Sequence, residues 1–129
     1  MKKLLTLFTL LITITCSAQF DLPFKEQNLT YNMADGNGNI TTDNFIRYNA
    51  LSFQIDGTGL DAADATVQVQ KSNNGTNFVN ISGATATLAS GTATSFIEVS
   101  GAKNEFYKLV ITVNTVTTGT LSIDLTGSR

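Results

Sequence analysis

The sequence contains no histidine and no tryptophan, only one cysteine at position 16, and only one proline at position 23. Without histidine the chain cannot assemble a Ser-His-Asp or a Cys-His catalytic site. The same absences remove the ligand sets of the usual zinc sites. We therefore expect a protein that is not an enzyme and that uses no cofactor.

Charge is also scarce, since Asp, Glu, Lys and Arg together make up 14% of the chain. The few basic residues form no cluster that would neutralise phosphates, so nucleic acid is not an expected partner. Thr, Asn, Ser, Gly and Ala are abundant instead, a composition typical of the surfaces of extracellular β-proteins.

The first eighteen residues have the three parts of a secretory signal peptide. Met1–Lys3 is basic, Leu4–Ile14 is an apolar run too short to span a membrane, and Cys16–Ala18 is a small-residue close. We predict cleavage before Gln19 and secretion through a bacterial-type signal. The alternative is a surface lipoprotein anchored through Cys16, which is disfavoured because Thr15 stands where such sites usually have Gly or Ala.

Loss of this leader removes the only cysteine, so the exported chain forms no disulfide and its stability must come from burial and strand pairing. Loss of Lys2 and Lys3 moves the net charge from −2 to −4. We predict three segments: a signal peptide over residues 1–18, an N-terminal arm over 19–28, and one β-sandwich domain over 29–129.

The clearest local pattern lies between residues 65 and 82, ATVQVQKSNNGTNFVNIS. Val67 and Val69 alternate with polar residues, which places the apolar side chains on one face of a strand. Asn74-Gly75 then tolerates the backbone conformation that a tight reversal needs, so the two halves are predicted to pair as a hairpin.

The same alternation recurs along the rest of the chain and predicts eight or nine short strands with no helix. A turn over 34–39 is expected to join the first two strands, and the last two are expected to form a long hairpin with its apolar face in the core. This pattern favours an all-β fold, an antiparallel β-sandwich of the jelly-roll or discoidin-like kind. The further strands are predicted at Leu29–Met33, Ile40–Tyr48, Ala50–Asp56, Thr85–Leu88, Ser95–Val99, Phe106–Val113 and Leu121–Thr126.

Two groups of proteins share motifs with this sequence. The run Val67–Phe78, then Phe106–Val110 and Gly119–Leu121, resembles the discoidin-like sandwich and also a set of small β-sandwich proteins of bacteriophage virions. The sequence departs from the discoidin-like hairpin motif in having Asn74 in place of Asp and Phe78 in place of Trp. The first resemblance implies loops that bind sugars or lipid head groups, and the second implies a structural or host-contacting role.

The turn at 72–78 holds the residues that we single out as a ligand site. Asn73, Asn74 and Asn77 supply amide groups, and Phe78 supplies an aromatic ring on which a sugar could stack. These four residues form the candidate site of a carbohydrate-binding module.

Two weaker patterns of oxygen ligands also occur. Asp35, Asn37 and Asn39 stand at alternate positions like the opening of a calcium loop, but the glycine and the bidentate glutamate of that motif are missing, so an Asn/Gly turn is favoured over a metal site. The carboxylates of Asp56, Asp61 and Asp64 form the one group suited to glycosidase-type acid–base catalysis, and they are interpreted instead as solvated loop residues.

Two functions remain open from the sequence. The favoured one is a secreted, non-catalytic sandwich with a structural or adhesive role, which contacts copies of itself or a glycan or protein of a cell surface through exposed strand edges or turns. The alternative is a carbohydrate-binding module that uses the 72–78 turn.

Overall fold

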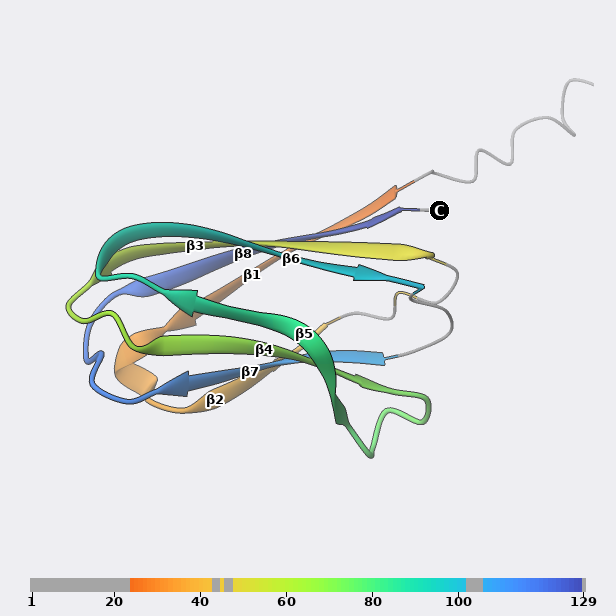
Figure 1. The fold of residues 1–129 in the computed structure, drawn as a ribbon, viewed down its shortest axis with the longest axis horizontal. Coiled ribbons are helices and arrows are strands. Elements are labelled where there is room, and N and C mark those ends of the chain that lie inside the picture. Colours follow the sequence, from red (N-terminus) through yellow and green to blue (C-terminus); the bar gives the residue numbers. More distant parts are fainter. Residues whose placement is uncertain (1–23, 43–44, 46–47, 102–105, 129) are drawn as a thin grey trace, which may run out of the picture.

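The computed structural model describes residues 24–42, 45, 48–101 and 106–128. Within them the chain forms eight β-strands and one short 3-10 turn, η1 (Figure 1). The elements are β1 Phe24–Asn32, η1 Met33–Asp35, β2 Gly38–Thr41, β3 Ala50–Leu60, β4 Ala65–Ser72, β5 Val79–Leu88, β6 Gly91–Ser100, β7 Phe106–Val113 and β8 Thr120–Ser128.

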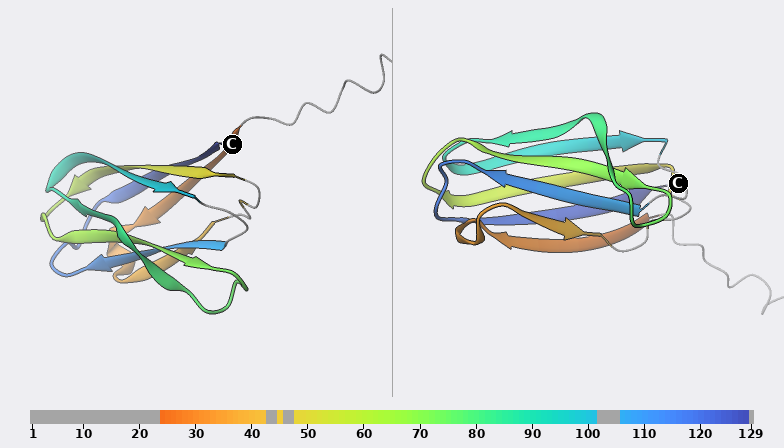
Figure 2. Two further views of the ribbon diagram at one scale, coloured as in Figure 1. Left: turned by 45° about the vertical axis from the view of Figure 1, so that its right-hand side comes forward. Right: turned by 90° about the horizontal axis from the view of Figure 1, so that it is seen from below.

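The strands form two antiparallel sheets of four strands that pack face to face, so the predicted all-β sandwich is confirmed (Figures 1 and 2). One sheet has the order β1-β8-β3-β6 and the other β2-β7-β4-β5. The first strand therefore pairs with the last, the second with the seventh, the third with the sixth and the fourth with the fifth. This is one long hairpin rolled into two layers, the arrangement of a jelly roll.

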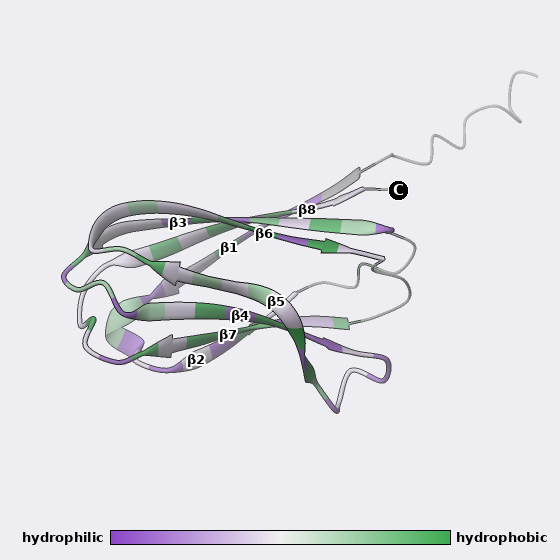
Figure 3. Cartoon of the chain, in the orientation of Figure 1, coloured by the Kyte–Doolittle hydropathy of each residue, from purple (hydrophilic) through white to green (hydrophobic). Residues whose placement is uncertain are grey.

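The core lies between the two sheets and follows the alternation of the sequence (Figure 3). In β4, for example, Ala65, Val67 and Val69 are fully buried while Thr66 and Gln68 are half-exposed. Strands with one apolar face bury it only against another sheet, which explains the two-layer packing. The largest fully buried side chains are Tyr107, Phe45, Phe53, Met33, Leu51, Ile55, Leu88, Leu109, Ile111, Leu121, Ile123 and Leu125.

Two of the predicted hairpins are wrong. β7 and β8 do not pair with each other: β7 pairs with β2 and β4 in one sheet, and β8 pairs with β1 and β3 in the other. β1 and β2, on either side of the turn near residues 34–39, likewise belong to different sheets. In both cases the connection crosses between the layers, whereas the hairpin predicted for β4 and β5 is confirmed.

Several strand boundaries also differ from prediction: β3 continues to Leu60 and not to Asp56, and β6 begins at Gly91 and not at Ser95. β1 begins at Phe24, so the part of the predicted 19–28 arm that the structure describes is an edge strand paired with β8. β2 ends at Thr41, earlier than the predicted Tyr48. The segments predicted as separate strands around residues 78–82 and 85–88 form one strand, β5.

A glutamine explains how β5 stays continuous. The β4–β5 register shifts between Gln68 and Gln70, and Gly83 in β5 adopts a φ of +78°, a conformation that favours glycine. The Gln68 Nε2 atom lies 3.0 Å from both the Ile81 and the Ala84 carbonyl oxygens and donates to them. The bulged backbone therefore keeps hydrogen-bond partners, and β5 bends without ending (Figure 1).

Candidate functional site

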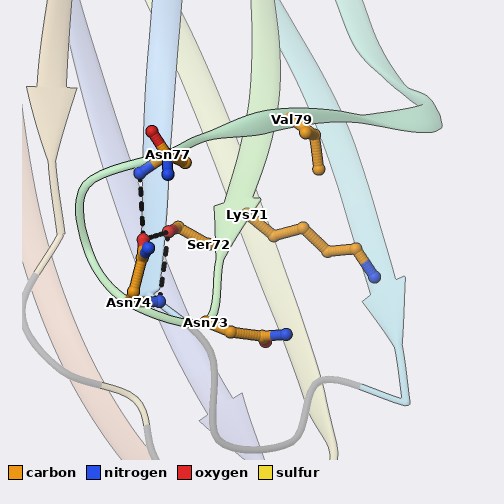
Figure 4. A pocket seen from close by; sticks show the side chains of 6 residues that line it. All are labelled: Lys71, Ser72, Asn73, Asn74, Asn77 and Val79. Carbon is orange, nitrogen blue, oxygen red and sulfur yellow. Dashed lines mark hydrogen bonds between the residues drawn. The ribbon is translucent and has the colours of Figure 1, made fainter.

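The turn between β4 and β5 is organised by the side chain of Asn74 (Figure 4). Its Oδ1 atom accepts hydrogen bonds from the backbone N–H groups of Thr76 and Asn77, both at 2.9 Å, and from the Ser72 hydroxyl at 2.9 Å. Such an Asx turn replaces backbone pairing at a sharp reversal. Asn74, which was predicted to bind ligand, thus uses its carbonyl oxygen to hold the turn in shape.

Beside this turn lies a hollow of about 330 Å³. It brings together three of the four predicted site residues, but Phe78 is not among the residues that line it. The Lys108 ammonium instead lies 4.5 Å from the centre of the Phe78 ring, a cation–π contact that covers one face of the ring. The lining residues are Lys71, Ser72, Asn73, Asn74, Asn77 and Val79.

The hollow offers polar groups around one apolar side chain. Asn73 and Asn77 are exposed, and Val79 is 59% exposed although it is apolar. Amides that both donate and accept hydrogen bonds, next to a small apolar surface, can bond the hydroxyl groups of a sugar, and Lys71 adds one positive charge to the lining.

One residue of the weak calcium pattern, Asn37, supports the fold. Asp35 lies in η1, and the Asn37 Oδ1 atom accepts a hydrogen bond of 2.6 Å from the backbone N–H of Val113 in β7. Asn39 is exposed on β2. Within the described residues no group of three or more His, Cys, Asp or Glu side chains gathers to hold a metal ion.

The three carboxylates considered for catalysis accept hydrogen bonds from threonines. Asp61 accepts from the Thr117 backbone N–H at 2.8 Å and hydroxyl at 2.5 Å, and from the Thr118 N–H at 3.2 Å. The Asp64 Oδ1 atom accepts from the Thr115 N–H at 2.9 Å. These bonds fasten the β7–β8 loop to the β3–β4 loop.

The hydrogen bond from the Thr117 hydroxyl is the main cause that lowers the pKa of Asp61. A bond from the Thr94 hydroxyl, followed by one from Gln54, lowers the pKa of Asp56. A glycosidase needs one carboxyl group whose pKa is raised so that it can act as the acid. The environments of Asp56 and Asp61 act in the opposite direction.

The lowered pKa of Asp61 predicts an acid-sensitive loop contact. A carboxyl group whose pKa is lower in the folded than in the unfolded state adds stability above the unfolded value, near 3.8, and this stability is lost as the pH falls through the folded value. We expect the melting temperature of Asp61→Asn to fall less than that of the wild-type protein between pH 5 and pH 2.5, as measured by circular dichroism.

Asp35→Asn is the matched control, because it also removes one exposed carboxylate. Asp35 lies at the same end of the sandwich as Asp61, since the N–H of nearby Met33 donates to the carbonyl of Gly119 in the β7–β8 loop. If Asp61→Asn and Asp35→Asn change the acid profile equally, the threonine contacts of Asp61 are not the cause.

Sequence analysis overlooked two exposed apolar side chains, Val79 in β5 and Phe96 in β6. Phe96 is 64% exposed. The exposure of Phe96 follows from the alternation once the faces are known: Ile97 and Val99 are buried, so Phe96 must point away from the core. The sequence feature that could have revealed it is a large aromatic residue on the face of β6 that otherwise carries Thr, Ser and Glu.

Comparison with known proteins gives little about function. No protein-family model and no curated protein matches the sequence. Among solved structures, a chain from Bacillus endospore appendages, which form a family of disulfide-linked pili, aligns with a TM-score of 0.47 and 14% sequence identity. The alignment covers 81% of this chain and 86% of that chain. A likeness at this level carries no functional argument.

No described helix has the length and apolar character needed to cross a membrane. The predicted signal peptide, residues 1–18, lies outside the described residues.

Proposed function

We propose that the chain is a secreted, non-catalytic structural or adhesive protein that associates with copies of itself through its exposed strand edges. Its role would parallel that of the phage virion sandwiches which the sequence resembles. The proposal depends on one observation: one side of the sandwich ends in two long strands that have almost no charge.

The four end strands of the two sheets differ in how they are protected from pairing with strands of other molecules. β1, FKEQNLTYN, contains a lysine and a glutamate, and β2 has only four residues. β5 and β6 each have ten residues, and Glu98 is the one charged residue between positions 79 and 100. Soluble proteins commonly protect end strands with lysine, proline or short length, because unpaired backbone groups there recruit other strands.

β5 and β6 lie along the same side of the sandwich, opposite β1 and β2 (Figure 2, right). Val79 and Phe96, the large exposed apolar residues in the part of the chain that the structure describes, lie on these two strands. A long edge that carries one charged residue and exposed apolar side chains favours contact with another protein surface over lasting exposure to water.

Sedimentation velocity of the secreted protein over a range of concentrations tests this proposal. We expect the average sedimentation coefficient to rise with protein concentration. The same rise should occur at high salt, because the proposed contacts involve backbone and apolar groups and few charges that salt could screen. A single monomeric species at every concentration would overturn the structural role, and specific binding on a glycan array would then favour the second candidate described below.

The hollow at the β4–β5 turn supports the second candidate, a carbohydrate-binding module. Its exposed amides, Asn73 and Asn77, would contact sugar hydroxyls beside Val79. The glycan array decides between the two, because binding that is lost in Asn77→Ala favours the module. Phe78→Ala separates the sequence-based site from the hollow, since Phe78 stands outside it.

A further inference from the structure

We infer that two copies of this chain pair through β6, antiparallel and centred on Phe96, so that the β1-β8-β3-β6 sheets of both copies join into one. This inference rests on the self-association proposed above and assigns it to one edge and one register.

β6 is the end strand best shaped to accept another strand. It pairs with β3 without a register shift from Ala93 to Ser100, so its backbone is regular over that length. β5, by contrast, is bent (Figure 1), has a positive φ at Gly83 and has a register shift against β4. Every second residue of a regular end strand directs its N–H and C=O groups away from the sheet, where an antiparallel partner can bond them.

Phe96 marks the centre of this edge. It stands on the outer face opposite Gln54 of β3, and Thr94 and Glu98 lie two residues away on either side. The buried neighbours Ile97 and Val99 hold the strand on the core, which fixes the direction in which Phe96 points. Covering this exposed apolar ring would remove more apolar surface from water than covering any other side chain on the outer face of the strand.

A two-fold pairing centred on Phe96 satisfies every position of the strand. Phe96 meets Phe96 of the second copy, an aromatic pair of the kind that stabilises neighbouring strands. On the same face Glu98 lies opposite Thr94, so the two Glu98 carboxylates stand four residues apart, about 13 Å, and are screened from each other. On the inner face Ile97 lies opposite Ser95, and Val99 opposite Ala93.

This geometry is isologous, because the same strand of each copy forms the contact and the symmetry closes it as a dimer. It uses residues 92–100 of β6, almost the whole strand. Any larger assembly would then be built from such dimers through other surfaces.

Cysteine cross-linking tests the register directly. In the proposed pairing the Phe96 Cα atoms are about 4.5–5.5 Å apart, within the range of a disulfide. We expect Phe96→Cys, made in a Cys16→Ala background that keeps a small residue at the predicted cleavage signal, to yield a covalent dimer under mild oxidation. Glu98→Cys should not, because its copies stand about 13 Å apart.

Val79→Cys is the control for non-specific oxidation, since Val79 is the other large exposed apolar residue and lies on β5. Equal cross-linking of Val79→Cys and Phe96→Cys, or none at Phe96→Cys at a concentration where this variant still self-associates, would overturn the assigned register.

Phe96→Lys tests the edge without oxidation. A lysine at the centre of the edge brings two like charges together, and we expect association about 30-fold weaker or more, as for the loss of a central contact residue. Val79→Lys should associate like the wild-type protein, and both variants should keep the wild-type circular-dichroism spectrum. Self-association unchanged in Phe96→Lys would refute the β6 contact and leave the proposed function standing. A wild-type protein that never associates would refute both.

Discussion

Replacing Leu109 by alanine will lower the free energy of unfolding by about 2–5 kcal/mol, the range for removing buried aliphatic bulk from a packed core. Leu109 is 0% exposed. In β7 it lies between Ile40 of β2 on one side and Val69 of β4 on the other. Neighbouring strands would therefore line the cavity that the substitution leaves. Ile111, two residues along on the same buried face, should respond similarly. Chemical denaturation followed by circular dichroism measures the change.

The neighbouring variant Val110→Ala is the control for which face of β7 points into the core. Val110 lies on the outer face of the same sheet and is half-buried, so its truncation should cost less than about 1 kcal/mol. Equal costs for Leu109→Ala and Val110→Ala would mean that β7 does not present one face to the core.

The faces of the strands could be predicted from the sequence because side chains alternate with a fixed period of two. In β7 the predicted apolar row begins Tyr107, Leu109 and Ile111, and all three are buried. In β8 the row of Leu121, Ile123 and Leu125 is buried as well. The sandwich follows from these rows, since only a second sheet can cover so many one-sided strands.

The partners of the strands could not be predicted in the same way. The alternation says which side of a strand is buried, but it is identical for two strands that pair and for two that face each other across the core. The β7–β8 connection was therefore interpreted as a hairpin, although it crosses from one sheet to the other. The crossing is accompanied by loop contacts between residues distant in sequence, such as Asp61 with Thr117, which no local pattern contains.

The candidate ligand site was predicted in part for the same physical reason. An Asn-Gly pair is a local signal, and the turn at Asn74-Gly75 formed where it was expected. Phe78 lies outside the hollow and contacts Lys108, which comes from a strand thirty residues away. No local pattern contains that contact.

Replacing Gly119 by alanine should destabilise the protein by about 2–5 kcal/mol, because two separate costs combine at this position. Gly119 adopts a φ of +111°, which side chains disfavour. A Cβ atom there would also lie 2.9 Å from the backbone oxygens of both Thr58 and Gly59, and 2.8 Å from the Leu60 side chain. Backbone oxygens cannot rotate away, so the β7–β8 loop would have to separate from β3.

Gly59→Ala divides these two costs. Gly59 also has a positive φ, +67°, but a Cβ atom there would meet no heavy atom within 4 Å. Its substitution should therefore show the backbone cost alone, about 1 kcal/mol. The excess of Gly119→Ala over Gly59→Ala, measured by denaturation under the same conditions, includes the cost of moving the β7–β8 loop away from β3 and the larger backbone cost at a φ of +111°. No excess would mean that the β7–β8 loop does not contact β3 there, and the hydrogen bonds of Asp61 to that loop would then lose their structural basis as well.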